Sequence, residues 1–191
     1  MKRLLCLGDS NTYGYDPRSY LGSRYPKDVR WTGLLEQSGR TVFNCGQNGM
    51  IIPRPYAFPG LERLLREKLP LDAVTVMLGS NDLLLGASVR ETAEQMEALL
   101  RFLRGAVGEA AIALIAPPVM RLGDWVPNES YIHASERLQD AYRELAEELD
   151  LPFADASAWG VELCYDGVHF TPAGHRAFAR GLAAFLAELG L

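Results

Sequence analysis

The nine residues Arg3–Asn11, RLLCLGDSN, join an apolar run to a short polar turn. The run Arg3–Leu7 is brief and apolar, as in a strand that is covered on both faces of a parallel sheet. Gly, Asp, Ser and Asn, which follow it, are typical turn residues. The same change from a short apolar run to a polar segment recurs along the chain. This repetition predicts an α/β domain.

Short apolar runs alternate with segments of helical period. The other predicted strands are Thr41–Asn44, Ala73–Leu78, Ala111–Ala116 and Pro152–Ala154. The predicted helices are Val29–Gln37, Leu61–Lys68, Ser88–Leu103, Tyr131–Leu149 and a last helix that Thr171 caps and that ends before Gly190. No linker or shift in composition divides residues 1–191. We therefore expect one domain, a three-layer α/β/α sandwich around a mainly parallel five-stranded sheet.

The composition excludes several classes of protein. The 191 residues include 19 Lys and Arg and 24 Asp and Glu, for a net charge of -5, and the basic residues are scattered among acidic ones. Binding to nucleic acid is therefore not expected. Apolar runs fall short of the roughly 18 to 20 residues of a membrane span, and the N-terminal run ends too early for a secretory signal. Three cysteines without a C-x-x-C pair favour a reduced, cytoplasmic protein.

Four irregular stretches are long and polar, and each follows a predicted strand. They are Asn11–Lys27, Cys45–Pro59, Gly79–Ala87 and Pro117–Ser130. The carboxyl edge of an open parallel sheet is where ligands bind. We therefore expect these stretches to form a functional site at that edge.

Ser10 has two interpretations, a residue of a capped turn or a nucleophile, and a nucleophile needs a base. The chain has three histidines. His133 lies in a helical stretch and is expected to be exposed, and His175, one turn into the last helix, is expected to have a surface or packing role. His169 ends the loop segment Asp166-Gly167-Val168-His169. Asp166 there could accept the Nδ1 hydrogen of the imidazole and leave Nε2 facing a nucleophile.

Two more strand ends carry candidate donors for a negative charge. Gly79-Ser80-Asn81-Asp82 is either an Asx-type turn or a segment that aims the Asn81 amide at the charge. In Asn44-Cys45-Gly46-Gln47-Asn48-Gly49, a glycine would let a backbone N–H approach the substrate closely. This segment matches neither the dinucleotide-binding fingerprint nor the P-loop, so nucleotide binding is not supported.

Together these segments resemble the SGNH hydrolases, or GDSL-type esterases, whose four blocks contribute Ser, Gly, Asn and His in this order on a flavodoxin-like sheet. The matching stretches are Leu5–Ser10, Asp28–Gly33, Leu78–Asp82 and Asp166–Thr171, and they are most similar to a bacterial arylesterase and acyltransferase group. The family name implies Leu at position 11, where this chain has Asn11. Because the adjoining Gly-Asp-Ser is intact, this departure is not expected to affect the chemistry.

The resemblance implies a role for each matching residue. Ser10 would be the nucleophile, His169 the base and Asp166 the partner of His169. The backbone N–H groups of Ser10 and Gly49 and the side chain of Asn81 would bind the oxyanion. The loops Cys45–Pro59 and Pro117–Ser130 differ from those of the arylesterase group. Substrate choice and acyl transfer therefore stay open.

The expected function is hydrolysis of short-chain acyl esters, above all acetyl esters of aryl alcohols or sugars, through an acyl-serine intermediate, with acyl transfer as a side activity. The alternatives are a carbohydrate O-deacetylase, a catalytically silent flavodoxin-like binding module, and a nucleotide or flavin binder. Neither a cofactor nor a metal is expected, and the partner would be a small ester.

Aromatic residues are frequent in the loop after Ser10 and recur near Trp125. Either they pack in the core and on the surface, or some of them line the cleft. The loop aromatics are Tyr13, Tyr15, Tyr20 and Tyr25, with Trp31 just beyond. Of these aromatics we expect Tyr13, Tyr15 and Trp125 to bind substrate. Self-association through Pro53–Tyr56 and Trp125 is left open.

Overall fold

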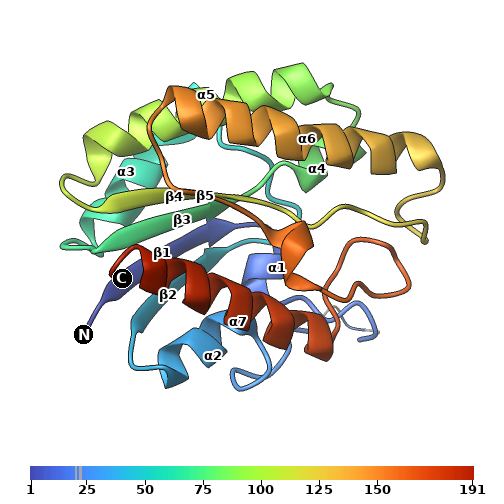
Figure 1. Cartoon of the computed structure of the whole chain (residues 1–191), viewed down its shortest axis with the longest axis horizontal. Coiled ribbons are helices and arrows are strands. Elements are labelled where there is room, and N and C mark those ends of the chain that lie inside the picture. The colour runs from blue at the N-terminus through green and yellow to red at the C-terminus, as the bar shows by residue number, and fades with distance from the viewer. Residues whose placement is uncertain (20, 22) are drawn as a thin grey trace.

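The structure is a computed structural model that describes residues 1–19, 21 and 23–191, and it is built on a five-stranded parallel sheet (Figure 1). The strands are β1 (Arg3–Gly8), β2 (Thr41–Gly46), β3 (Ala73–Met77), β4 (Ala111–Ala116) and β5 (Phe153–Asp155). Their order in the sheet is β2-β1-β3-β4-β5, and every neighbouring pair is parallel. The predicted α/β sandwich with a five-stranded parallel sheet is confirmed. Tyr20 lies outside the described residues.

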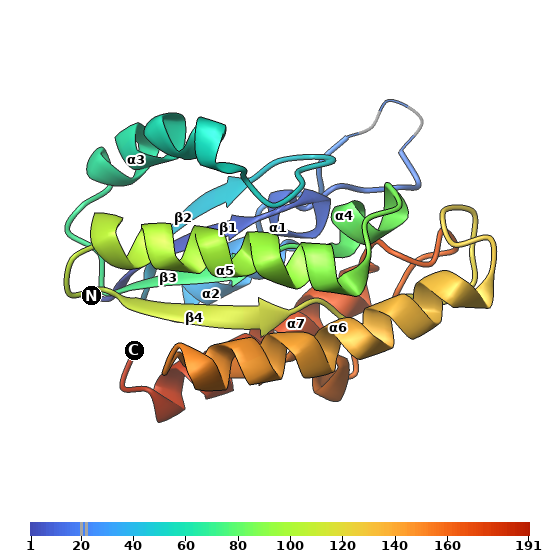
Figure 2. The same ribbon diagram turned by 90° about the horizontal axis from the view of Figure 1, so that it is seen from above.

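Helices cover both faces of the sheet, as Figures 1 and 2 show. In chain order they are α1 (Ser10–Tyr13), α2 (Trp31–Gln37), α3 (Phe58–Arg66), α4 (Ser80–Leu84), α5 (Val89–Ala106), α6 (Glu129–Glu148) and α7 (Pro172–Glu188), with single 3-10 turns at Pro55–Ala57 and Ala156–Trp159. Side chains of α3, α5 and α6 form the core on one face, and those of α2 and α7 form the core on the other.

Alternating residues of the strands divide between the two cores. In β1, Leu5 and Leu7 pack with α3, α5 and α6, whereas Leu4 and Cys6 pack with α2 and α7. All four side chains are buried. Because both faces are covered, the strand needs apolar residues at successive positions, and this explains the continuous apolar run in the sequence. Each leucine buried in this way contributes about 1.5 to 3 kcal/mol.

Two short helices were expected to be irregular loop. The helix α1 begins one residue before the stretch Asn11–Lys27 and overlaps its start, and α4 lies within Gly79–Ala87. Each is only about one turn long, so neither is long enough to show a helical repeat of apolar residues. The first is specified by its ends, because the Asp9 side chain accepts a hydrogen bond from the Asn11 N–H and Gly14 ends the helix in the left-handed conformation.

The strand order places a crevice between β1 and β3. The chain runs from β1 to β2 on one side and then returns to β3 on the other side of β1. The loops that leave the carboxyl ends of β1 and β3 therefore diverge, and ligands bind at such a switch point. Ser10 lies two residues after the end of β1, and Asn81 lies four residues after the end of β3.

Candidate active site

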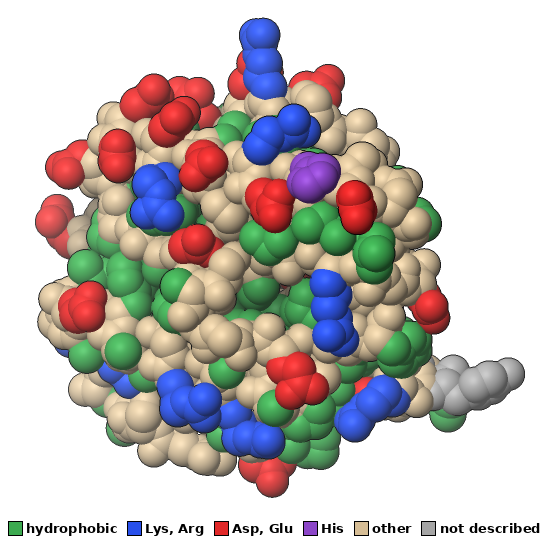
Figure 3. Space-filling view, turned by 45° about the vertical axis from the view of Figure 1, so that its right-hand side comes forward, with side chains coloured by type: hydrophobic (Ala, Val, Ile, Leu, Met, Phe, Trp, Pro, Cys, Tyr) green, Lys and Arg blue, Asp and Glu red, His purple; other side chains and the backbone are tan. Residues whose placement is uncertain are grey.

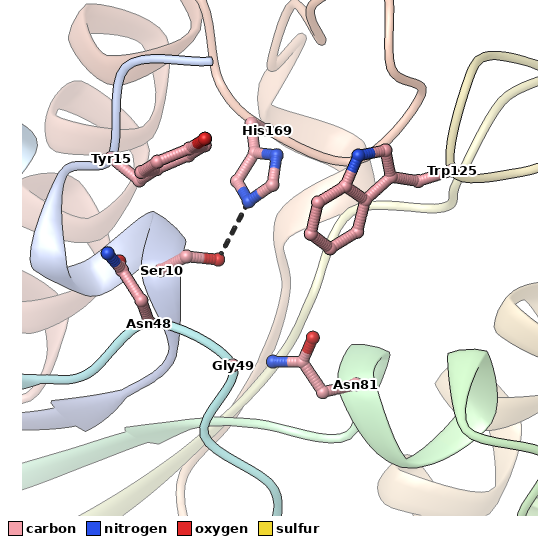
Figure 4. A pocket seen from close by; sticks show the side chains of 7 residues that line it. All are labelled: Ser10, Tyr15, Asn48, Gly49, Asn81, Trp125 and His169. Carbon is pink, nitrogen blue, oxygen red and sulfur yellow. Dashed lines mark hydrogen bonds between the residues drawn. The ribbon is translucent and has the colours of Figure 1, made fainter. Parts of the chain in front are cut away.

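Ser10 is fixed by the sharp turn from β1 into α1. The strand ends at Gly8, Asp9 caps the helix, and Ser10 is its first residue. The side chain of Ser10 faces the space in front of His169 (Figure 4). Only 6% of the surface of Ser10 is accessible.

Ser10, His169 and Asp166 form one hydrogen-bonded row. The Ser10 Oγ lies 2.9 Å from Nε2 of His169, and Nδ1 of His169 lies 2.7 Å from Oδ2 of Asp166. His169 and Asp166 are buried. With the Nδ1 hydrogen held by a carboxylate, Nε2 is the nitrogen free to accept the hydroxyl proton of Ser10. The structure thus brings together the three residues that the sequence indicated.

The loop before α7 is shaped around the Asp166 carboxylate. Its Oδ1 accepts hydrogen bonds from the backbone N–H groups of Val168 and His169, both at 2.9 Å. Gly167 adopts a φ of 85°, and a Cβ there would collide with the Arg121 carbonyl oxygen. Burial by itself would raise the pKa of Asp166, but the hydrogen bonds from the ring and backbone of His169 and from Val168 outweigh it and lower the pKa. Asp166 therefore stays a carboxylate.

Gly49 and Asn81 lie on the other side of Ser10 (Figure 4). Gly49 adopts a φ of 69°, which favours glycine, and a Cβ there would meet open space. Asn81 lies in the first turn of α4, and its Nδ2 donates a hydrogen bond to the carbonyl oxygen of Met50 at 3.0 Å. An amide nitrogen carries two hydrogens, so one donor of Asn81 remains for a ligand.

A buried carboxylate holds the segment that follows Gly49. The Oδ2 of Asp82 accepts a hydrogen bond from the Ile52 N–H at 3.1 Å, and Oδ1 pairs with the Arg54 guanidinium at 3.2 Å. Burial raises the pKa of Asp82, and these two partners offset part of that rise. Asn81 and Asp82 together join the loop after β3 to the loop after β2.

A cavity of about 210 Å³ opens on the row. It is lined by Ser10, Tyr15, Asn48, Gly49, Asn81, Trp125 and His169 (Figure 4). A second hollow, of about 320 Å³, shares Gly49, Asn81 and Trp125 with the first and extends to Leu84 and Leu85. The space-filling view of this side of the molecule shows hydrophobic side chains around a hollow, with acidic and basic side chains interspersed (Figure 3).

The predicted aromatic residues divide into two groups. The His169 ring lies between Tyr15, at 4.8 Å between ring centroids, and Trp125, at 5.3 Å. Tyr13 lies elsewhere, with the Arg24 guanidinium 4.4 Å from its ring centroid. Tyr25 is buried beside His175.

The other histidines have the structural surroundings that the sequence favoured. His133 is exposed on α6 and pairs with Glu136. His175 is fully buried in the first turn of α7.

Two asparagines at the site had no role in the sequence analysis. Asn48 lines the cavity, and its position directly before Gly49 was the available signal. Asn11 is buried and hydrogen-bonds to backbone groups on both sides of His169. The sequence signal for Asn11 was the departure from the family motif directly after Ser10, which was not expected to affect the chemistry.

Neither a membrane span nor a metal site is found in the part of the chain that the structure describes. None of its helices combines the length and the apolar composition needed to cross a membrane. Within residues 1–19, 21 and 23–191, no group of three or more His, Cys, Asp or Glu side chains is arranged to hold a metal ion.

Comparisons with known proteins identify the family of the chain and similar folds. The native aryl esterase of M. smegmatis is 29% identical, with a TM-score of 0.85 over 99% of this chain and 100% of that one. A carbohydrate acetylesterase from Sinorhizobium meliloti is 26% identical, with a TM-score of 0.83 over 99% of this chain and 100% of that one. The comparison with curated protein sequences finds no match. The model of the GDSL-like lipase/acylhydrolase family matches residues 6–177, so the chain belongs to this family and is an esterase.

Proposed function

We propose that this esterase cleaves short-chain acyl esters, above all acetyl esters, through an acyl intermediate on Ser10. The observation that carries the proposal is the row Ser10–His169–Asp166 at the wall of a small cavity. The arrangement supplies a nucleophile, a base within hydrogen-bond distance and a carboxylate that orients the base.

In the first step, Nε2 of His169 takes the hydroxyl proton while the Ser10 Oγ attacks the ester carbonyl carbon. The carbonyl oxygen becomes an oxyanion, which the N–H groups of Ser10 and Gly49 and the free amide hydrogen of Asn81 stabilise. When the tetrahedral intermediate collapses, the ester C–O bond breaks and the alcohol leaves with the proton from His169. Water then attacks the acyl-enzyme in the same way and releases the carboxylic acid.

The size and lining of the two hollows support a short acyl group and a ring-shaped alcohol. The cavity at Ser10 is small, and Tyr15 and Asn48 bound it on one side. The hollow beside it is bordered by Leu85 and Trp125, which are 75% and 53% exposed. An aryl or sugar ring would cover these apolar surfaces. The likeness to both an aryl esterase and a carbohydrate acetylesterase supports either alcohol. Acyl transfer would follow if an alcohol replaced water in the second step.

The test is hydrolysis of p-nitrophenyl acetate by the wild type, by Ser10→Ala and by Ser38→Ala. Ser38 ends α2 and is the matched control. We expect kcat to fall by about 10⁶-fold in Ser10→Ala and to be unchanged in Ser38→Ala. A fluorophosphonate probe should label the peptide that contains Ser10. Full activity in Ser10→Ala would reject the nucleophile, and a wild type that cleaves neither acetate nor octanoate esters would favour the silent binding module. A preference for octanoate would reject the short acyl group.

A further inference from the structure

Asn11 connects the nucleophile to the loop that carries the base. Its Nδ2 donates a hydrogen bond to the Val168 carbonyl oxygen at 3.1 Å, and its Oδ1 accepts one from the Phe170 N–H at 3.0 Å. These two backbone groups stand on either side of His169. Asn11 follows Ser10 directly in α1 and is 4% exposed. The buried side-chain amide of Asn11 therefore bridges the backbone groups before and after His169, whose ring faces Ser10.

The backbone of Asn11 is fixed as well. Its N–H donates to Oδ1 of Asp9 at 2.9 Å, and its carbonyl oxygen accepts a hydrogen bond from the Trp31 indole N–H at 2.9 Å. Trp31 is itself buried in the core between α2 and α7. The side-chain amide of Asn11 therefore extends from a fixed backbone, and it can transmit the position of α1 to the loop before α7.

Two other backbone hydrogen bonds of the loop lie within it or join it to the segment after β4. The Cys164 N–H donates to the His169 carbonyl oxygen at 2.6 Å, within the loop itself. The Trp125 N–H donates to the Asp166 carbonyl oxygen at 3.0 Å and so joins the loop to the segment after β4. Both bonds shape the loop, whereas the bonds of Asn11 fix it against the helix that carries Ser10.

The chemistry of the amide suits both backbone groups. It donates to a C=O and accepts from an N–H at the same time. Leucine, which the family motif has at this position, would leave both buried backbone groups without this partner. Each unpaired group would lower the stability of the folded chain. Aspartate would still accept from Phe170 but would turn an oxygen toward the carbonyl of Val168.

We propose that Asn11 is a positioning residue, which holds Nε2 of His169 at hydrogen-bond distance from the Ser10 hydroxyl. The inference rests on the proposed function, in which His169 is the base. Displacement of a reacting group by about 1 Å can cost 10²-fold in rate. Asn11 does not line the cavity, and its side chain hydrogen-bonds to the backbone on either side of His169, so we expect it to act on the rate through the position of His169.

The test is a double-mutant cycle on p-nitrophenyl acetate with Asn11→Leu, His169→Ala and the double variant. We expect Asn11→Leu to lower kcat by about 10²-fold with KM within about twofold of the wild type. In the His169→Ala background the same change should alter the residual kcat by less than about twofold, because the group it positions is gone. A loss that only reflects weaker folding would not depend on His169.

Two further variants keep the outcome clear. Gln139→Leu removes another buried amide, which donates to the Pro117 carbonyl oxygen at 2.6 Å, and should leave kcat unchanged. Asn11→Asp keeps the size of the side chain and its hydrogen-bond acceptor for the Phe170 N–H. It replaces Asn11→Leu if that variant does not fold. Its loss of kcat should likewise be absent in the His169→Ala background.

Two results would overturn the inference. One is a folded Asn11→Leu enzyme with near-normal kcat, and the other is an equal loss in both backgrounds. Full activity in His169→Ala would instead reject the proposed base and leave the esterase without its assigned mechanism. The two failures are therefore distinguishable.

Discussion

Two buried histidines stand on either side of Thr171, the residue that caps α7, and their surroundings are alike in most respects. His169 and His175 are 2% and 0% exposed. Each ring lies among aromatic rings at centroid distances of 4.8 to 5.4 Å. The pairs are Tyr15 with Trp125 around His169 and Tyr25 with Phe170 around His175. Neither burial nor aromatic neighbours therefore distinguish the two residues.

The hydrogen bonds do distinguish them. His169 has a carboxylate at Nδ1 and a hydroxyl at Nε2. His175 has the Trp31 N–H at 3.5 Å from Nδ1, and its Nε2 is without a partner among the described residues. Burial, and then the positive charge of Arg30, lowers the pKa of His175 to about 3. His175, buried and without a carboxylate partner, thus stays neutral. His169 differs in having a hydrogen-bond partner on each ring nitrogen.

Among the variants that test this comparison, the largest effect is expected from Asp166→Asn, which removes the carboxylate from Nδ1 of His169. An amide in place of the carboxylate can hold the imidazole in the wrong tautomer and cannot stabilise the imidazolium ion, so kcat should fall by about 10⁴-fold. KM for p-nitrophenyl acetate should change little. The measurement is kcat and KM at pH 7.5, with circular dichroism to show that the fold is kept.

Asp155→Asn is the matched control for this variant. Asp155 also accepts a backbone N–H two residues on, that of Ser157 at 2.8 Å, but it caps a turn away from the cavity. It should keep wild-type kcat. If Asp166→Asn lost less than tenfold, the carboxylate would not be what separates His169 from His175.

The sequence was sufficient for the sheet and for the hydrogen-bonded row because both depend on local patterns. Strands buried on both faces are continuous apolar runs, Ser10 stands at the turn after such a run, and Asp166 and His169 lie in the loop between the last strand and α7. The parallel sheet then places these turns at the same edge. Their proximity follows from topology, without knowledge of any side-chain conformation.

Features that depend on side-chain packing could not be predicted from the sequence. Tyr13 and Tyr15 are two positions apart and equally aromatic, yet the end of α1 at Gly14 turns one under Arg24 and the other onto His169. The role of Asn11 needs a contact between residues more than 150 positions apart. No local period or motif reports such contacts.

An intermediate effect is expected from Trp125→Ala, which removes one of the two rings beside His169. An aromatic contact contributes about 0.5 to 1.5 kcal/mol, so kcat/KM for phenyl acetate should fall by roughly 2- to 12-fold. Ethyl acetate, which has no ring to place against Trp125, should lose less. Tyr56→Ala is the control, because Tyr56 is an exposed aromatic on the 3-10 turn Pro55–Ala57. Equal losses for both esters would place the alcohol elsewhere.

The smallest effect on activity, none at pH 7.5, is expected from His175→Gln, which should act on stability instead. Because the pKa of His175 is about 3 in the folded chain and about 6.5 when unfolded, the unfolded state binds more protons between these values. This residue therefore reduces stability as pH falls from about 6.5 toward 3, by up to about 1.4 kcal/mol per pH unit. Glutamine fills a similar space and does not titrate.

Urea unfolding of both proteins at pH 6.5 and pH 4.5 isolates this contribution. Asp9, whose pKa burial raises to about 6, acts with the opposite sign in the same range, but it is present in both proteins and cancels in their difference. Over these two pH units the variant should gain about 2 to 3 kcal/mol relative to the wild type. A difference in stability that does not change with pH would mean that the pKa of His175 is the same in the folded and the unfolded chain. The contrast with His169 would then lie only in the hydrogen-bond partners of His169, Asp166 and Ser10.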